Sequence, residues 1–387
     1  MRDRILKGRQ GQYKLIDTIG SGTMATVFIG RDVLSNRIFA VKVLKPDVAV
    51  QEDLLKRFKR EAEILTTLAN PHVVRLIEYA LDDTIYFLVM EYVDGATLKQ
   101  CIVAGGAFPT ERALDFAEQI AKALHVAFQQ QVIHRDVKPQ NILVTAGNLA
   151  KLTDFGLARS QNSAPLTERG TFMGTAYYAS PEQVRDSHNV DTRADLYALT
   201  CVFFEMLTGR VPYEGKNVLD VLGMHINGPL PSLLALRPDI PPAFEEFIHK
   251  GMAKNPAARF QTPQEYIQEL EALKMHLDAP PLRAQVTILA NGVVVYLTKV
   301  HSTIGRLDSQ FSPPEVDLTN LDNTRRVSRR HARILQEGGH FFVEDLKALN
   351  PTRLNGVPLP PFEKHELHDG DTLHVGDLDL RFSLVQS

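Results

Sequence analysis

The sequence predicts an α+β chain that ends in a separate all-β sandwich. Residues 13–45 alternate apolar and polar positions around turn signals, a pattern typical of antiparallel strands. Residues 111–275 have mainly helical spacing, with turn-rich interruptions at 134–148 and 154–182. After the proline-containing stretch 278–283, short alternating runs separated by Gly, Asn and Pro indicate strands again. The three patterns follow one another along the chain, so we expect separate domains.

Composition narrows the class of protein. A net charge of −3 over 387 residues argues against a chain devoted to nucleic acid. Two cysteines, Cys101 and Cys201, form neither a disulfide framework nor a metal cluster, which favours the reducing cytoplasm. The charged start does not resemble a signal peptide, and the longest apolar run, 196–207, is shorter than the roughly 20 residues of a membrane span. We expect this run to be a buried helix and the protein to lie in the cytoplasm, without membrane attachment.

The first strands enclose a glycine-rich turn. Residues 19–30 contain Gly20 and Gly22, which allow close approach of a ligand and offer amide donors, although an ordinary tight turn explains the same pattern. Lys42 lies within the apolar run of the third strand. In the helix expected over 52–68, Glu61 shares the apolar stripe, whereas Glu63 points away. Because a lone buried carboxylate is costly, we predict a Lys42–Glu61 ion pair. Strands are expected at 73–80 and 84–90.

Polar side chains gather on two later loops. Residues 132–144 group Asp136, Lys138 and Asn141 before a short apolar strand, and Asp154 ends the next strand before a glycine. Two carboxylates, an amide and a lysine suit hydroxyl activation, Mg²⁺ coordination and neutralisation of a transferred phosphate. The order and spacing of the four indicate phosphoryl transfer.

These motifs resemble those of eukaryotic-type serine/threonine protein kinases, which catalyse phosphoryl transfer. The resemblance covers about 13–275 and implies a bilobal fold with a β-rich small lobe and a helical large lobe. It implies ATP with Mg²⁺ or Mn²⁺ as cofactors and Asp136 as the residue that orients the substrate hydroxyl and accepts its proton. Lys42, paired with Glu61, would hold the α- and β-phosphates, Lys138 would contact the γ-phosphate, and Asn141 and Asp154 would bind the metal. The ATP site implied by family consists of Ile19, Gly20, Ser21, Gly22, Val27, Ala40, Lys42, Met90, Glu91, Val93 and Leu143.

The resemblance also implies specificity and regulation. The lysine of "DVKPQN" and the segment "GTAYYASPE" are typical of serine/threonine kinases, and Thr175 would bridge Asp136 and Lys138. Arg135 would pair with a phosphorylated activation loop, for which Thr171 and Thr167 are the main acceptors and Ser160 and Ser163 lesser ones. We therefore expect autophosphorylation. Structural roles fall to the Glu182–Arg259 pair and to Asp195.

One residue departs from the kinase pattern: Ala25 replaces the third glycine of the nucleotide loop. Its methyl group is tolerable if φ stays negative, but it stiffens the loop. This departure supports an alternative function, a scaffold with a slow or inactive kinase domain. Small-molecule phosphotransfer is a second alternative, which the segment for an extended polypeptide, 174–182, disfavours.

The C-terminal part resembles a forkhead-associated (FHA) domain over about 283–386, on the motifs "IGR", "SRRH" and "NG". That resemblance implies phosphothreonine binding by Arg306 and Ser328, assisted by Arg329, with Asn350 bonded to the peptide backbone and His331 structural. Five arginines in residues 325–334 permit nucleic-acid binding as an alternative, but interleaved aromatic residues are lacking. Where the family has Ser-Thr-Asn-Gly, residues 348–351 read Ala-Leu-Asn-Pro, so Leu349 removes a hydroxyl and Pro351 stiffens the turn.

The domain boundaries follow from both resemblances. We predict an N-terminal tail over 1–12, a kinase domain over 13–275, a linker over 276–282 and an FHA domain over 283–387. The partners would be protein substrates and phosphothreonine proteins, with transient self-association and no nucleic acid or membrane. A short linker gives the reader a high effective concentration beside the kinase.

Overall fold

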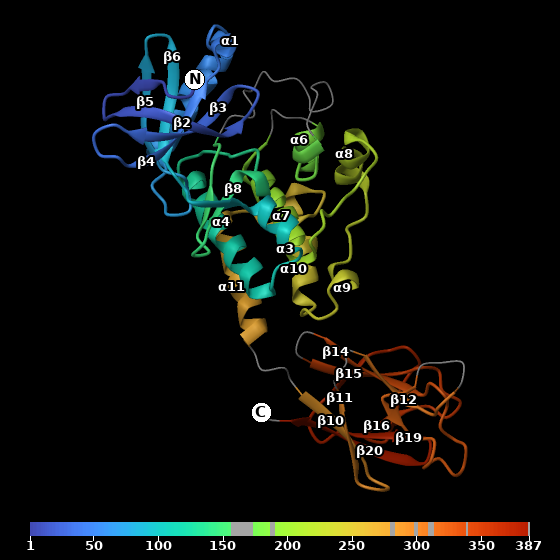
Figure 1. Cartoon of the computed structure of the whole chain (residues 1–387). Coiled ribbons are helices and arrows are strands. Elements are labelled where there is room, and N and C mark those ends of the chain that lie inside the picture. The colour runs from blue at the N-terminus through green and yellow to red at the C-terminus, as the bar shows by residue number, and fades with distance from the viewer. Residues whose placement is uncertain are drawn as a thin grey trace. The chain divides into compact units, whose positions relative to one another are not determined.

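The structure, a computed structural model, describes residues 1–155, 173–185, 190–278, 283–297, 301–308, 313–337 and 340–385 (Figure 1). The chain divides into two compact units, whose main parts are Met1–Ile240 with Phe244–Lys274, and Met275–Ser387. Among the described helices, none is both long and apolar enough to span a membrane.

The first unit begins with an antiparallel six-stranded sheet of order β1-β2-β3-β4-β6-β5. Its inner face buries an apolar cluster that includes Leu15, Val41 and Phe87. Residues 5–7, which the sequence analysis left in a tail, pair with β2 because Leu6 completes this cluster. The strands are β1 (Ile5–Lys7), β2 (Gln12–Ser21), β3 (Ala25–Asp32), β4 (Ile38–Leu44), β5 (Leu76–Asp82) and β6 (Ile85–Glu91); the helices are α1 (Pro46–Ala49) and α2 (Glu52–Thr67).

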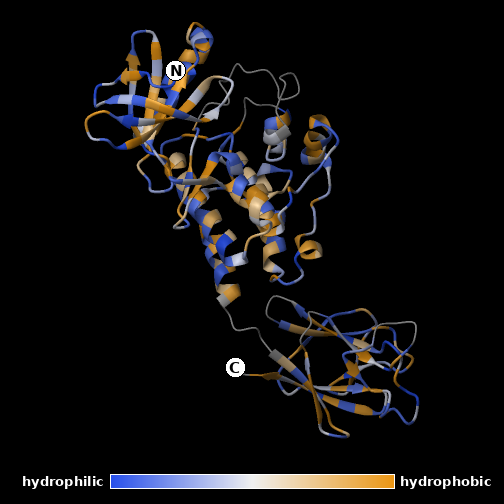
Figure 2. Ribbon diagram, viewed as in Figure 1, coloured by the Kyte–Doolittle hydropathy of each residue, from blue (hydrophilic) through white to orange (hydrophobic). Residues whose placement is uncertain are grey.

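The rest of this unit is mainly helical, as predicted. Its centre is α7, in which every residue from Ala194 to Leu207 is buried, so the apolar run 196–207 is a core helix. α4 buries one side only, and blue and orange residues mix along it in Figure 2. The helices are α3 (Leu98–Gly105), α4 (Thr110–Gln129), η1 (Pro139–Asn141), α5 (Met173–Ala176), α6 (Pro181–Arg185), α7 (Thr192–Thr208), α8 (Val218–Asn227), α9 (Leu233–Leu236), α10 (Ala243–Gly251), η2 (Pro256–Ala258) and α11 (Pro263–Asp278).

A small sheet of β7 (Gly95–Thr97), β8 (Ile142–Thr145) and β9 (Ala150–Leu152) lies where the two lobes meet. Leu152 joins them through its backbone: its N–H donates to His72 O at 2.8 Å, and its carbonyl accepts from Val74 N at 2.9 Å. The loops flanking this sheet carry the polar motifs of residues 134–141 and 154, so their residues lie beside the small lobe.

The second unit is an all-β sandwich, as predicted. One sheet has the order β11-β10-β20-β19-β16-β17 and the other β13-β12-β14-β15-β18. Alternate residues such as Val286, Ile334 and Phe382 form the buried core between them. The strands are β10 (Arg283–Ile288), β11 (Val293–Leu297), β12 (His301–Gly305), β13 (Val316–Asp317), β14 (Ala332–Glu337), β15 (His340–Asp345), β16 (Arg353–Leu354), β17 (Val357–Pro358), β18 (His365–Leu367), β19 (Thr372–Val375) and β20 (Leu378–Val385).

Candidate active site and phosphopeptide site

The predicted lysine–glutamate pair forms inside the first unit. Lys42 lies on β4 and is 4% exposed, and Glu61 lies on the inward face of α2 and is 1% exposed. Lys42 Nζ is 2.8 Å from Glu61 Oε1 and 2.6 Å from Asp154 Oδ1. One ammonium group therefore ties α2 to the loop after β9, across the two lobes.

Charge and burial act on these three groups together. Burial raises the pKa of Glu61 to about 7 against the opposing attraction of Lys42, and the Asp154 carboxylate adds repulsion. For Lys42, the two carboxylates outweigh the effect of burial and hold the pKa above its ordinary value. Burial alone would raise the pKa of Asp154, but Lys42 overcomes it and holds this pKa below its ordinary range. Asp154 therefore stays anionic.

The loop around Asp136 forms a second polar cluster. The Asp136 carboxylate accepts hydrogen bonds from Lys138 Nζ at 2.7 Å and from Asn141 Nδ2 at 3.0 Å, both at Oδ2. Lys138 Nζ also donates to Thr175 Oγ1 at 3.1 Å, as predicted for a serine/threonine-type segment. The four side chains therefore lie together, although they come from two separate segments of the chain.

Buried groups hold the Asp136 loop and the start of the loop after β9 in strained conformations. Arg135 and Asp154 have φ of 68° and 63°, values that non-glycine residues rarely adopt. The Asp195 carboxylate on α7 accepts the backbone N–H groups of His134 and Arg135, both at 2.7 Å. The buried ring of Phe155 packs edge-on against His134, with centroids 4.6 Å apart. Asp195 thus has the structural position expected of it.

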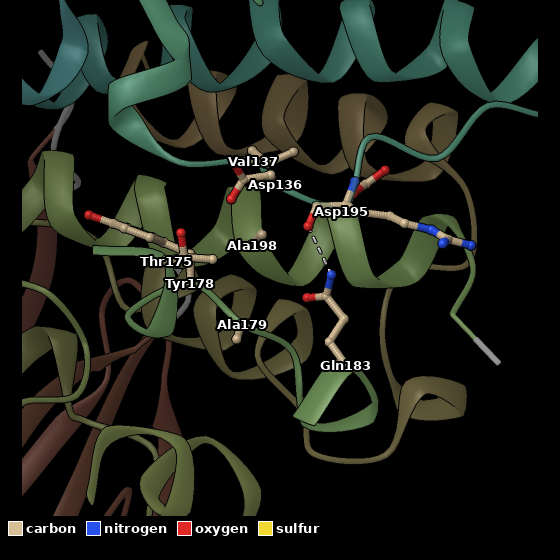
Figure 3. A pocket seen from close by; sticks show the side chains of 9 residues that line it. Asp136, Val137, Thr175, Tyr178, Ala179, Gln183, Asp195 and Ala198 are labelled. Carbon is tan, nitrogen blue, oxygen red and sulfur yellow. Dashed lines mark hydrogen bonds between the residues drawn. The ribbon is translucent and has the colours of Figure 1, made fainter. Parts of the chain in front are cut away.

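Figure 3 shows the hollow between the Asp136 loop and the segment after α5. It is about 10 Å³, room for roughly one water molecule, and Asp136, Thr175, Gln183 and Asp195 line it. Gln183 Nε2 donates to the Arg135 carbonyl at 3.0 Å (Figure 3). The sequence analysis missed Gln183, because a polar residue on the short helix α6 carries no distinguishing pattern.

An apolar cluster lies beside these polar groups. Ala40, Val74 and Met90 form a buried cluster, against which Val27, Val93 and Leu143 pack. These residues come from both lobes and include five of those predicted for the ATP site.

In the glycine-rich turn, open space lies beside Gly20 and Gly22. A Cβ placed on Gly20 would meet only Val27 Cβ, at 4.0 Å, and one on Gly22 only the Ala25 carbonyl, at 3.7 Å. Ala25 itself is buried in a cluster with Leu44 and Phe58, and its φ is not positive. The methyl group at this departure from the kinase pattern is therefore accommodated without backbone strain.

The structure brings some of the other predicted residues into place. Arg259 makes a two-point contact with Glu182, at 2.7 and 2.8 Å, and its guanidinium is buried. Burial lowers the pKa of Arg135, and nearby Arg60 on α2 lowers it further. Glu91, at the end of β6, anchors its side chain on Lys151 at 2.7 Å. Thr167, Thr171, Ser160 and Ser163 lie outside the described residues.

In the second unit, three loops meet around Ser328. Its hydroxyl accepts from Leu349 N at 3.3 Å, its own N–H donates to the buried His331 ring at 3.0 Å, and Arg306 N donates to Arg329 O at 3.3 Å. Asn350 Nδ2 donates to the Arg326 carbonyl at 3.0 Å. The four predicted phosphopeptide residues therefore lie on adjoining loops, with His331 beneath them.

Two acidic residues organise these loops, and the sequence analysis missed both. The nearly buried Asp322 carboxylate accepts from Arg326 N at 2.9 Å and Val327 N at 3.1 Å, and it lies 3.3 Å from Arg306 Nε. Asp308 Oδ2 lies 2.6 Å from Arg329 Nε. Acidic residues near an arginine run read as ordinary solvated charges, so only the folded contacts distinguish them.

Fold and site together are those of a protein kinase. The family model of the protein kinase domain matches residues 13–270, so the chain belongs to this family. The FHA domain model matches residues 302–376, and both matches agree with the resemblances drawn from the motifs.

Similar proteins are named as serine/threonine-protein kinases. A probable serine/threonine-protein kinase of Clostridium perfringens is 41% identical over 263 residues, which cover 68% of this chain and 38% of that protein. Serine/threonine-protein kinase PrkC of Bacillus subtilis is 38% identical over 255 residues, covering 66% and 39%. The chain thus spans about two fifths of the length of these relatives. The crystal structure of the Mycobacterium tuberculosis PknI kinase domain superposes with a TM-score of 0.54 at 26% identity, covering 70% of this chain and 98% of that one.

Proposed function

We propose that the protein transfers the γ-phosphate of ATP to serine and threonine hydroxyls of proteins. This proposal rests mainly on two clusters of polar side chains, Lys42–Glu61–Asp154 and Asp136–Lys138–Asn141. The apolar cluster of Ala40 and Met90 is the surface proposed to contact adenine, and the turn with Gly20 and Gly22, where an added Cβ would meet no atom closer than 3.7 Å, is proposed to approach the phosphates. The boundaries predicted from the sequence, 13–275 for the kinase domain and 283–387 for the FHA domain, belong to this proposal, with 276–282 as the linker.

Each cluster has a separate task in the proposed reaction. Lys42 holds the α- and β-phosphates, with Glu61 keeping its ammonium in place. Asp136 orients the substrate hydroxyl and accepts its proton, while Lys138 neutralises charge on the transferred group. The Asn141 amide and the Asp154 carboxylate are oxygen donors of the kind Mg²⁺ prefers, and the metal when bound neutralises phosphate charge.

A radiolabelled ATP assay on a generic basic protein tests this function. Lys42→Ala and Asp136→Ala should each lower kcat by at least about a hundredfold, since Lys42 positions the α- and β-phosphates of ATP and Asp136 acts on the reacting hydroxyl. Lys56→Ala, which removes an exposed lysine of α2, is the matched control. Wild-type turnover no higher than that of Asp136→Ala would favour the scaffold alternative, a slow or inactive kinase domain with an interaction module.

We further propose autophosphorylation on Thr171 or Thr167, read by Arg135. Burial lowers the pKa of Arg135 against the opposing attraction of Asp195, and Arg60 on α2 lowers it further, so a phosphate bound beside Arg135 would offset the repulsion from Arg60. Intact-mass analysis of the protein expressed alone should show added phosphate, and Asp136→Ala should show none. Unmodified Thr167 and Thr171 in active wild type would refute the regulation but leave the kinase function standing.

For the FHA domain we propose phosphothreonine reading through Arg306, Ser328, Arg329 and Asn350. It would recruit phosphorylated substrates or a second copy of the chain in the cytoplasm, without nucleic acid or membrane. Calorimetric titration of the full chain with matched phosphorylated and unphosphorylated peptides should show phosphate-dependent binding that Arg306→Ala abolishes. Arg381→Ala, an exposed arginine of β20, is the control. Equal affinity for both peptides would exclude this role.

A further inference from the structure

The rim of the proposed phosphothreonine site carries a strongly exposed apolar side chain. Leu349 is 89% exposed, the highest value among the large apolar residues of the described chain. Its backbone N–H donates to Ser328 Oγ at 3.3 Å, so the leucine is anchored directly beside the hydroxyl expected to touch phosphate. Leu307, which follows Arg306 on the neighbouring loop, is 52% exposed.

Folding does not account for this leucine. Leu349 is neither a member of the apolar core of the sandwich nor packed against it. The residues beside it in sequence or across the loops include the exposed cations Lys347, Arg326 and Arg329. A lone exposed leucine is common on protein surfaces, but the backbone of this one is bonded to Ser328, the residue proposed to touch phosphate, which places the leucine next to the proposed ligand.

We propose that Leu349 makes this site selective for phosphothreonine peptides with a large apolar residue near the phosphothreonine. The inference rests on the proposed phosphothreonine reading and adds the side-chain chemistry of the ligand. The arginines attract the phosphate, and the leucine and the apolar peptide residue remove each other from water. Affinity then comes from charge at one point and apolar burial at the next.

A competing explanation predicts the opposite change in peptide affinity for Leu349→Thr. The FHA pattern has threonine where this chain has Leu349, so the leucine could act only by omitting a hydroxyl that helps to hold phosphate. In that case Leu349→Thr would tighten binding of every phosphopeptide. If the leucine is a contact for the peptide, the same substitution weakens binding only where the peptide carries an apolar partner.

The test is a peptide series titrated into the full chain without nucleotide. Phosphothreonine stands in an alanine background, and leucine or aspartate is placed in turn at each of the three positions on either side. One leucine placement should bind about fivefold to twentyfold more tightly than alanine, the scale for partial burial of a leucine side chain. Leu349→Thr and Leu349→Ala should remove this gain and leave the all-alanine peptide unchanged, while Leu289→Thr, which alters another exposed leucine, should keep it.

The salt dependence of affinity separates the apolar contribution from the phosphate contribution. The ratio of leucine to alanine affinity should persist at high salt, whereas the contribution of phosphate should fall. Equal affinities for all neighbours, a preference for aspartate, or tighter binding of every phosphopeptide by Leu349→Thr would overturn the inference while phosphate dependence survives. If phosphorylation of the peptides makes no difference to wild type, it is the proposed function that fails.

Discussion

A buried carboxylate in the small lobe offers the most direct test of how the fold is held. Glu78 on β5 is 7% exposed and accepts hydrogen bonds from Arg9 N at 2.8 Å, Gln10 N at 3.2 Å and Tyr13 Oη at 2.5 Å. It therefore joins the N-terminal segment to β5, whose Leu76 packs against the apolar cluster of Ala40 and Met90.

Glu78→Ala should lower the free energy of unfolding by about 1.5–5 kcal/mol. Hydrogen bonds to a charged acceptor are worth about 1.5–3 kcal/mol when buried, and Tyr13, which donates one of them, is only 2% exposed. The two backbone donors are only part-buried and can be rehydrated, so they add about 1 kcal/mol each at most. The melting temperature should fall by about 10 °C, given roughly 2–4 °C per kcal/mol in a domain of this size.

Thermal unfolding followed by circular dichroism measures this loss. Tyr13→Phe removes one donor and should cost about 1–2 kcal/mol. Glu63→Ala, on the exposed face of α2, should change stability by less than about 0.5 kcal/mol. In a chain lacking residues 1–10, Glu78→Ala should cost clearly less, since two donors are already gone. An unchanged cost in that background, or a loss below about 1 kcal/mol in the full chain, would refute the reasoning.

Further predictions concern three buried residues and one exposed glycine. Burial lowers the pKa of His225 to about 3. Between about pH 6.5 and pH 3, His225 therefore binds a proton in the unfolded chain but not in the folded chain. Stability should fall by up to about 1.4 kcal/mol per pH unit between those values, and His225→Gln should flatten that slope in melting curves. Arg259→Ala should cost about 3–5 kcal/mol in denaturant unfolding because it leaves Glu182 without its partner, and a loss under 1 kcal/mol would contradict the ion pair's role. Gly305→Ala would place a Cβ 2.2 Å from the Arg329 carbonyl and should destabilise the FHA domain by at least about 3 kcal/mol. Gly223→Ala, in open space on α8, should instead stabilise its domain by about 0.5–1 kcal/mol, and calorimetry distinguishes the two signs.

Much of the site was readable from local patterns. Glu61 falls on the apolar stripe of a helix, and that periodicity alone required a buried cation such as Lys42. Asp136, Lys138 and Asn141 are so close in sequence that any compact loop brings them together. The alternation of residues 13–45 likewise predicted the strands that carry Lys42.

Other features depend on contacts between distant segments. Asp154 reaches Lys42 across 112 positions, the Glu78 fastening joins residues 65–69 positions apart, and Asp322 reaches Arg306 from another loop. A carboxylate that organises a loop and one that is merely solvated look alike in sequence, because burial and geometry, which set the energy of an ion pair, arise only after folding. The sequence by itself predicted the class of chemistry and the residues proposed to perform it. Tertiary structure alone decided which charges share a partner, since that depends on how far apart the fold leaves them and how much water it excludes.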